Sequence, residues 1–261
     1  MNRHTHRPRK RFGQNFLHDR GIIERILAAA RLTPEDHVVE IGPGLGALTL
    51  PLRQRVGRLE LVELDRDLVA HWQQRLGDDP KVRIHAADAL DFDFAALKAE
   101  RPLRLIGNLP YNISTPLIFH LLSQRQAIAD MLFMLQREVV ERLGAAPGSK
   151  AYGRLSVMVQ SVCRVDPLFR VPPGAFRPAP KVESRLVRLT PYLQPPHPLG
   201  DEALFARLVA AAFGQRRKTL RNTLKGMVTE ADLRACGIDP SARAEKLTIA
   251  DYAALSRRLS R

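Results

Sequence analysis

The residues of this chain best suited to chemistry are the cluster Asn108-Leu109-Pro110-Tyr111, which directly follows an apolar run. The Asn108 amide oxygen and a main-chain carbonyl near Leu109–Pro110 can accept both N–H bonds of an exocyclic amine, which turns the nitrogen lone pair toward an electrophile. Pro110 fixes φ and has no backbone N–H, so this cluster presents mainly hydrogen-bond acceptors. The Tyr111 ring can stack on a base, worth roughly 1–3 kcal/mol. The cluster therefore indicates transfer to an adenine amine, although it is also good turn chemistry.

A proline-stiffened segment, residues 171–181, presents one aromatic ring, Phe176. This ring could cover the second face of a base that Tyr111 holds, which is how an extruded base is commonly gripped. The alternative is that Phe176 is an anchor of the hydrophobic core. Both interpretations stay open at the level of the sequence.

A glycine-rich turn, residues 40–46 (EIGPGLG), supplies a candidate cofactor site. Gly42 and Gly44 let the backbone turn sharply and approach a ligand with no Cβ in the way. Glu63 ends the next apolar run, where a doubly wound sheet hydrogen-bonds ribose hydroxyls. NAD, FAD and S-adenosylmethionine all suit such a turn, but the dinucleotide spacing G-x-G-x-x-G would leave Gly46 unexplained.

Asp88 favours S-adenosylmethionine among these cofactors. It follows the third apolar run, where its carboxylate can accept a hydrogen bond from the adenine amine; capping of the next helix is the alternative. Direct transfer of the sulfonium methyl needs positioning and electrostatics rather than a covalent enzyme intermediate. The eight histidines show no metal-ligand spacing, so we expect no metal.

These residues can meet only if a parallel sheet brings the strand ends to one edge. Short apolar runs alternate with helix-period segments from Gly21 to about Leu135, which is typical of parallel strands with crossover helices. The pattern predicts strands at 37–41, 58–64, 82–85, 103–107, 129–135, 155–163 and 184–190, and helices at 21–31, 47–56, 66–76 and 115–124.

Seven strands with a late β pair predict an α/β fold, a Rossmann-like class I methyltransferase sheet with helices on both faces. Four prolines in residues 191–198 predict a stiff linker. Helical patterns then follow at 201–213, 216–226, 229–236 and 248–260. The predicted parts are a basic arm (1–12), a catalytic domain (13–190), a linker (191–200) and a small all-α RNA-binding domain (201–261).

The charge balance indicates a polyanionic partner. Lys plus Arg number 41 against 27 acidic residues, a net charge of +14, and nucleic acid is the commonest partner of such a field. On the predicted helix 216–226, Arg217, Arg221 and Lys225 share one face while Leu220 and Leu224 face the core. The alternatives are that this helix face is only solvated and that the basic arm, residues 1–12, is an import signal. The expected phosphate contacts are Arg9, Lys10, Arg11, Arg216, Arg217, Lys218, Arg221 and Lys225.

The compartment follows from cysteines and hydropathy. Cys163 and Cys236 lie far apart, and we expect both as free thiols in a reducing compartment. No apolar stretch approaches the ~18 residues that a membrane span needs. We therefore expect a cytoplasmic protein without a membrane partner.

Together these residues resemble the bacterial small-subunit rRNA adenine dimethyltransferase family. The resemblance implies S-adenosylmethionine-dependent dimethylation of two adjacent adenosines in the hairpin loop near the 3′ end of 16S rRNA, during small-subunit biogenesis. It also implies the cofactor contacts Asn15, Leu17, Gly42, Glu63, Asp88 and Asn108. Nothing in the sequence demands a dimer, so we expect a monomer. Gly46 stands where some relatives have alanine, and the linker is richer in proline. The runs that carry the resemblance are 10–17, 39–46, 63–65, 107–114, 150–157 and 176–182.

Three other functions remain as alternatives. The macrolide-resistance methyltransferases modify a large-subunit adenine, but Leu109 and the run 150–157 favour the small-subunit family. A non-catalytic assembly factor on the same fold would not need intact Asn108, Tyr111 and Gly42. An NAD oxidoreductase would leave the cluster at 108–111 without a role.

Overall fold

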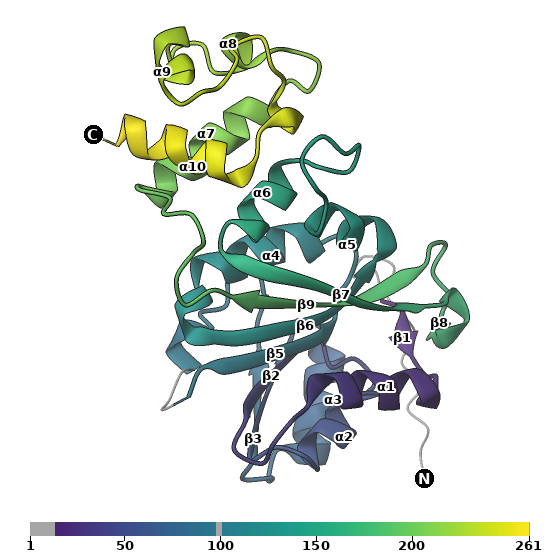
Figure 1. Ribbon diagram of the computed structural model, residues 1–261. Coiled ribbons are helices and arrows are strands. Elements are labelled where there is room, and N and C mark those ends of the chain that lie inside the picture. The colour runs from purple at the N-terminus through teal and green to yellow at the C-terminus, as the bar shows by residue number, and fades with distance from the viewer. Residues whose placement is uncertain (1–13, 98–100, 261) are drawn as a thin grey trace. The chain divides into compact units, whose positions relative to one another are not determined.

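Seven strands form one sheet, with the order β4-β3-β2-β5-β6-β9-β7, in the computed structural model, which describes residues 14–97 and 101–260 (Figure 1). Strands β2 to β6 run parallel, and β9 pairs antiparallel with β6. This order confirms the predicted Rossmann-like methyltransferase sheet. The strands are β2 (His37–Ile41), β3 (Arg58–Glu63), β4 (Val82–Ala86), β5 (Leu103–Asn108), β6 (Ile128–Gln136), β7 (Cys163–Val171) and β9 (Ser184–Pro191).

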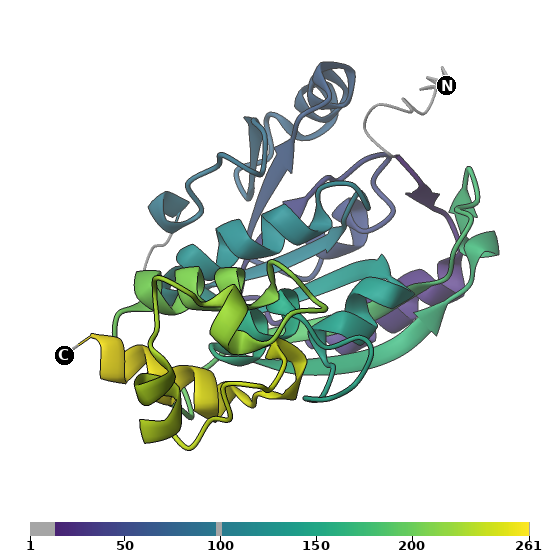
Figure 2. The same cartoon turned by 90° about the horizontal axis from the view of Figure 1, so that it is seen from above.

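Helices cover both faces of this sheet (Figures 1 and 2). On one face, α1 (Arg20–Ala30), α2 (Thr49–Arg53) and α3 (Arg66–Leu76) pack on the strands through a buried apolar cluster. α4 (Ser114–Ser123) lies on the opposite face. Every residue of β2 is buried, as expected for a parallel strand covered on both sides. Short 3₁₀ turns complete the connections at Ala95–Leu97, Arg125–Ala127, Pro173–Ala175 and Ala244–Lys246.

The described chain divides into two compact units, with boundaries after Arg137, Val165 and Pro191. Of the described residues, the first unit holds 14–97, 101–137 and 166–191, and the second holds 138–165 and 192–260. Residues 138–165, which the sequence assigns to a catalytic domain spanning 13–190, therefore cluster with the C-terminal helices instead. The functions expected of the predicted parts stay predictions.

The predicted strand at 155–163 is wrong. That segment begins with α6 (Arg154–Gln160), and β7 starts only at Cys163. The Ser156 hydroxyl accepts the Gly153 N–H at the helix start and donates to the Arg142 carbonyl. Burial on the helix, with Leu155 and Val159 one turn apart, outweighs the β propensity of the valines. α5 (Arg137–Leu143), which precedes α6, was not predicted.

The second unit contains the predicted C-terminal helices α7 (Glu202–Phe213), α9 (Glu230–Ala235) and α10 (Ile249–Leu259). α7 and α10 pack against each other, and α9 packs on α10. The predicted helix 216–226 is reduced to α8 (Leu220–Thr223). It starts late because the N–H groups of Leu220 and Arg221 donate to the carbonyls of Ala242 and Pro240 rather than to a preceding turn.

Phe176 lies in the core of the first unit. Its strand, β8 (Phe176–Arg177), pairs antiparallel with β1 (Phe16–Leu17), so that Leu17 faces Phe176. Phe176 is 2% exposed and belongs to the apolar cluster under the sheet. The ring therefore packs as a core anchor in this structure, and its contact with a base stays a prediction.

Neither cysteine forms a disulfide bond, as predicted, and Cys163 is buried. Among the described residues, no helix is long and apolar enough to cross a bilayer. The same residues contain no cluster of three His, Cys, Asp or Glu side chains that could hold a metal ion.

Candidate active site

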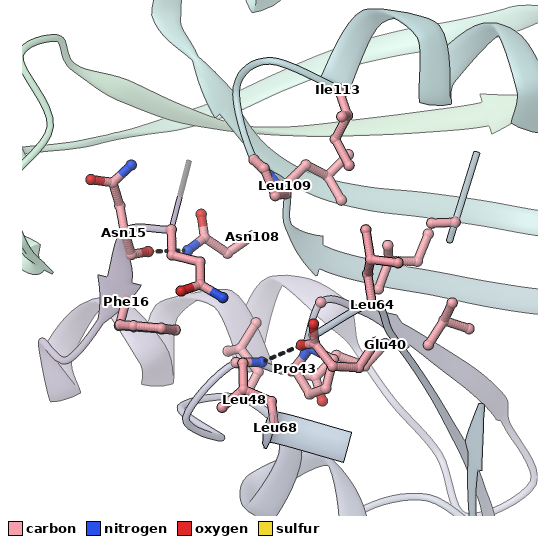
Figure 3. Close-up of a pocket in the computed structure, with 18 of the residues that line it drawn as sticks. Asn15, Phe16, Glu40, Pro43, Leu48, Leu64, Leu68, Asn108, Leu109 and Ile113 are labelled. Carbon is pink, nitrogen blue, oxygen red and sulfur yellow. Dashed lines mark hydrogen bonds between the residues drawn. The ribbon is translucent and has the colours of Figure 1, made fainter. Parts of the chain in front are cut away.

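A pocket of about 340 Å³ lies at the carboxyl edge of the parallel strands in the first unit (Figure 3). The cluster at 108–111 and the glycine turn line the same pocket, as the sequence predicted. Residues 14–17 also line the pocket. Residue patterns alone did not place this segment there; its Asn15 and Leu17 are contacts that the family resemblance implies.

The glycine turn connects β2 to α2 and exposes backbone to the pocket. Gly42 has a φ of 67°, a conformation that L side chains rarely adopt, and a Cβ there would meet nothing within 4 Å. The Gly42 N–H donates to the Val62 carbonyl at 2.9 Å, which ties the start of the turn to β3. The turn can therefore hold its shape and still leave open space for a ligand.

Glu63 connects the end of β3 to the glycine turn. It is 7% exposed, and burial raises its pKa above the ordinary value. Its Oε1 accepts the Asp65 N–H at 2.9 Å, and its Oε2 accepts the Gly44 N–H at 3.3 Å. These bonds fix the carboxylate at the pocket wall, where it retains acceptor capacity for ligand hydroxyls.

Asp88 lines the pocket just after β4. Its Oδ1 accepts the Leu90 N–H at 2.9 Å. It thus stabilises a turn rather than capping a helix, since the next helical element of the described chain begins at Ala95. A carboxylate has two acceptor oxygens, so this bond leaves Oδ2 available to a ligand.

Glu40 also lines the pocket, although the sequence predicted it only as part of the glycine turn. It is 2% exposed, and burial raises its pKa to about 8. Its Oε2 has no hydrogen-bond partner within the described part of the chain. A buried acceptor without a partner is costly, so a cationic ligand group would satisfy it. The signal for this role was its acidic type, two residues before the first glycine.

Asn108 is oriented by the N-terminal segment. Its Nδ2 donates to the Asn15 main-chain carbonyl at 2.8 Å (Figure 3). Because a carbonyl can only accept, this bond defines which end of the amide is the nitrogen. Oδ1 is left without a partner among residues 14–97 and 101–260. The side chain therefore presents a hydrogen-bond acceptor.

Tyr111 is anchored at its hydroxyl. The Oη atom lies 2.7 Å from Ser184 Oγ on β9, and Ser184 is fully buried. Burial also raises the pKa of Tyr111, so the phenol stays neutral. Ser184 was missed because it lies 73 positions away in the sequence, and no local pattern marks it.

The turn after Asn108 is held from two sides. The Leu109 N–H donates to the Met134 carbonyl at 3.3 Å, and the Pro110 carbonyl accepts the Ile113 N–H at 3.2 Å. The Pro110 carbonyl is thus partly engaged within the turn, whereas no such bond to the Leu109 carbonyl is made among the described residues.

None of the described candidate RNA-binding residues lines this pocket, and the others fall outside the described residues. Arg9, Lys10 and Arg11 belong to the part of the chain that the structure does not describe. The others, Arg216, Arg217, Lys218, Arg221 and Lys225, are all exposed in the second unit. Leu220 and Leu224 are buried there, as predicted. The basic residues do not form a continuous helical stripe, because α8 spans only Leu220–Thr223.

Two acidic side chains, an unpaired buried carboxylate oxygen and the glycine turn line this pocket together. This set suits a ligand with ribose hydroxyls, a purine amine and a cationic end. Next to it, the Asn108 acceptor and the Tyr111 ring could hold a second base.

Comparisons with known proteins show what the whole chain is similar to. Residues 5–261 match the family model described as Ribosomal RNA adenine dimethylase. The chain is 57% identical over 251 residues to Ribosomal RNA small subunit methyltransferase A of Marinobacter nauticus, covering 96% of this chain and 91% of that protein. It is 58% identical to the protein of the same name from Aromatoleum aromaticum, with 96% and 94% covered.

Two solved structures are also similar. A dimethyladenosine transferase from Plasmodium falciparum has a TM-score of 0.78 and 26% identity, covering 92% of this chain and 95% of that one. The 23S rRNA methyltransferase ErmE has a TM-score of 0.71 and 25% identity, covering 95% and 100%.

Proposed function

The chain belongs to the ribosomal RNA adenine dimethylase family, and we propose that it is an S-adenosylmethionine-dependent methyltransferase of the small ribosomal subunit. Its substrates would be the exocyclic amines of two adjacent adenosines in the hairpin loop near the 3′ end of 16S rRNA. The names of its relatives support the small subunit. The choice of these two adenosines is our proposal.

The pocket residues fit S-adenosylmethionine, which supplies an electrophilic methyl group when bound. Glu63 would accept hydrogen bonds from the ribose hydroxyls, and Asp88 Oδ2 would accept a hydrogen bond from the adenine amine. The unpaired Glu40 Oε2 would bind the ammonium of the methionine end. Leu17, Gly42 and Gly44 would line the same ligand. We propose that no metal takes part.

Asn108 and Leu109 would orient the target amine. The Asn108 Oδ1 and the Leu109 carbonyl would accept its two N–H bonds, so that the nitrogen lone pair faces the methyl group. Tyr111 would stack on the target base, with its hydroxyl held by Ser184. The methylated nitrogen is cationic and therefore acidic, and it releases its proton to water, so the site needs no strong general base. Positioning therefore accounts for most of the catalysis.

Transfer of two methyl groups to one nitrogen sets a further requirement. The site must accept both the amine and the monomethylamine, so it must be roomier than a site for single transfer. In the second round one N–H bond remains, and one acceptor of the Asn108 and Leu109 pair suffices. Product analysis that shows arrest at monomethyladenosine would contradict this part of the proposal.

One observation carries the proposal: the Asn108 amide is turned by the Asn15 carbonyl so that an acceptor oxygen remains, in the pocket that the glycine turn also lines. The direct test is mass spectrometry of rRNA from cells with and without this protein. We expect both dimethyladenosines of the 16S hairpin to disappear in its absence. Loss of a 23S modification instead would favour the large-subunit alternative, and unchanged rRNA would favour a non-catalytic factor.

The partner and compartment follow from this substrate. We propose that the enzyme acts as a monomer, in the cytoplasm, on 16S rRNA in the subunit or its precursor. The exposed basic residues of the second unit, together with Arg9, Lys10 and Arg11, would bind rRNA phosphates.

A further inference from the structure

Trp72 lies directly behind the glycine turn. It stands on α3, is fully buried and does not line the pocket. A Cβ built on Gly46, whose φ is 88°, would lie 2.3 Å from the Trp72 Cη2 atom and 2.8 Å from Cζ2. The indole ring therefore occupies the space that any side chain at position 46 would need. This contact explains the third glycine of the turn.

Trp72 also makes a polar contact with the same turn. Its Nε1–H donates to the Gly44 carbonyl at 3.0 Å. The N–H of Gly44 donates to Glu63 Oε2 at 3.3 Å. Both polar groups of Gly44 are thus bound, one by the indole and one by the carboxylate that faces the pocket.

We infer that Trp72 is a positioning residue for cofactor binding, which acts through the glycine turn without touching the ligand. The inference rests on the proposed function, because it concerns the same S-adenosylmethionine site. The indole N–H and the ring together hold Gly44 and Gly46 in place, and Gly44 in turn holds the Glu63 carboxylate toward the ribose position. Loss of this contact would leave the Gly44 carbonyl without its donor and let the turn and Glu63 move.

A purely structural role of Trp72 makes a different prediction. A residue that only fills the core lowers thermal stability when it is changed, and other buried residues of α3 would do the same. A positioning residue weakens cofactor binding beyond what the loss of stability explains. Val69 offers a matched control, because it is buried on the same helix and does not line the pocket.

The test compares Trp72→Phe with Val69→Ala in the full-length protein. Isothermal titration calorimetry with S-adenosylmethionine measures Kd, and differential scanning calorimetry measures Tm. We expect Trp72→Phe to raise Kd by about 5- to 30-fold, the factor that a lost buried interaction commonly produces. Val69→Ala should lower Tm and change Kd less than about twofold. The KM for S-adenosylmethionine should rise in Trp72→Phe while kcat at saturation changes little.

A double-mutant cycle addresses the steric half of the inference. Gly46→Ala should raise Kd and lower Tm in the wild-type background, where the new Cβ meets the indole. In a Trp72→Leu background the same change should raise Kd and lower Tm by smaller amounts, because the indole atoms that the new Cβ would meet are absent. The strain of alanine at a positive φ is common to both backgrounds and cancels in the cycle. Equal costs in the two backgrounds would overturn the steric claim.

The remaining outcomes separate this inference from the proposed function. If wild-type protein does not bind S-adenosylmethionine, the proposed function fails, whatever Trp72 does. If wild type binds and Trp72→Phe binds within twofold of it, the positioning role is refuted. The role is refuted as well if Val69→Ala weakens binding as much as Trp72→Phe.

Trp72 is the single tryptophan of the chain, so its fluorescence reports on this position alone. Its emission should change as S-adenosylmethionine binds, with the same Kd as in calorimetry. An unchanged spectrum at saturation would also count against the inference.

Discussion

The Asn108 side-chain amide donates to the main-chain carbonyl of Asn15 at 2.8 Å, although 93 positions separate the two residues. This bond joins the segment before α1 to the end of β5, and both segments line the candidate cofactor pocket (Figure 3). It also decides which atom of Asn108 is left for a substrate. A main-chain carbonyl performs this task, so the side chain at position 15 is not required for it.

Asn108→Ala should abolish most turnover without unfolding the protein. The change removes an acceptor that is positioned for the target amine, and loss of one such group commonly costs about 10²–10³-fold in kcat. S-adenosylmethionine should bind with a Kd within a few-fold of wild type. Methyl incorporation into 16S rRNA and calorimetric titration on the same preparation measure both. Asn108→Asp is the companion variant. It keeps an acceptor but cannot donate to Asn15, so its activity should lie between that of wild type and that of Asn108→Ala. Unimpaired incorporation by Asn108→Ala would refute the assigned role.

Ser184→Ala and Tyr111→Phe should have the same effect, because they remove the two ends of one hydrogen bond. A freed Tyr111 ring would stack less well on the base, so kcat/KM for rRNA should fall by about 3- to 10-fold. The Kd for S-adenosylmethionine should not change. The double variant should be no worse than either single variant, since contacting residues are non-additive. Additive losses of kcat/KM would show that Ser184 affects activity independently of the Tyr111 hydroxyl.

Glu40 makes stability depend on pH. Burial raises its folded-state pKa to about 8 from an ordinary value of 4.5, so between these values the folded state holds a proton that the unfolded state releases. The free energy of unfolding should therefore fall as pH rises through this window, by up to roughly 1.4 kcal/mol per pH unit. Urea denaturation of wild type and Glu40→Gln at pH 5, 6.5 and 8 isolates this contribution. The difference between the two proteins should shift in favour of Glu40→Gln as pH rises; a difference that is constant with pH would contradict it.

The same carboxyl should couple cofactor affinity to pH. An ammonium group favours the ionised form of Glu40, so binding of S-adenosylmethionine should tighten between pH 6 and 8 and release a proton. Titrations in buffers of different ionisation enthalpy would measure that proton. Glu40→Gln should bind more weakly and show a flatter pH dependence. Equal proton release by both proteins would exclude Glu40 as its source.

Charge reversal in the second unit should weaken rRNA binding in a salt-dependent way. Arg217 and Arg221 are exposed, and each lost phosphate contact should reduce the slope of log K against log salt by roughly 0.7–0.9. The double variant Arg217→Glu/Arg221→Glu should keep its cofactor affinity. Arg83→Glu, an exposed change on β4 of the first unit, is the control and should leave the slope unchanged. An unchanged slope in the double variant would exclude these two residues from the RNA interface.

Much of the candidate site could be predicted from local patterns. Gly42, Glu63, Asp88 and Asn108 each follow an apolar run, and parallel strands bring their carboxyl ends to one edge of a sheet. Because strand length, the turn and the order along the chain are all local properties, the sequence alone determined that these residues would meet. It also determined the helices α1, α3, α4 and α7, whose apolar periodicity is strong.

What the tertiary structure decided were contacts between distant parts of the chain. The valine-rich segment 155–163 became a helix because its packing and the Ser156 bonds outweigh a weak β preference. Phe176 became a core residue because β8 pairs with β1. The partners Ser184 for Tyr111, Asn15 for Asn108 and Trp72 for Gly44 have no local signature. Such pairings depend on how separate elements pack, and local residue preferences are too small in energy to specify them.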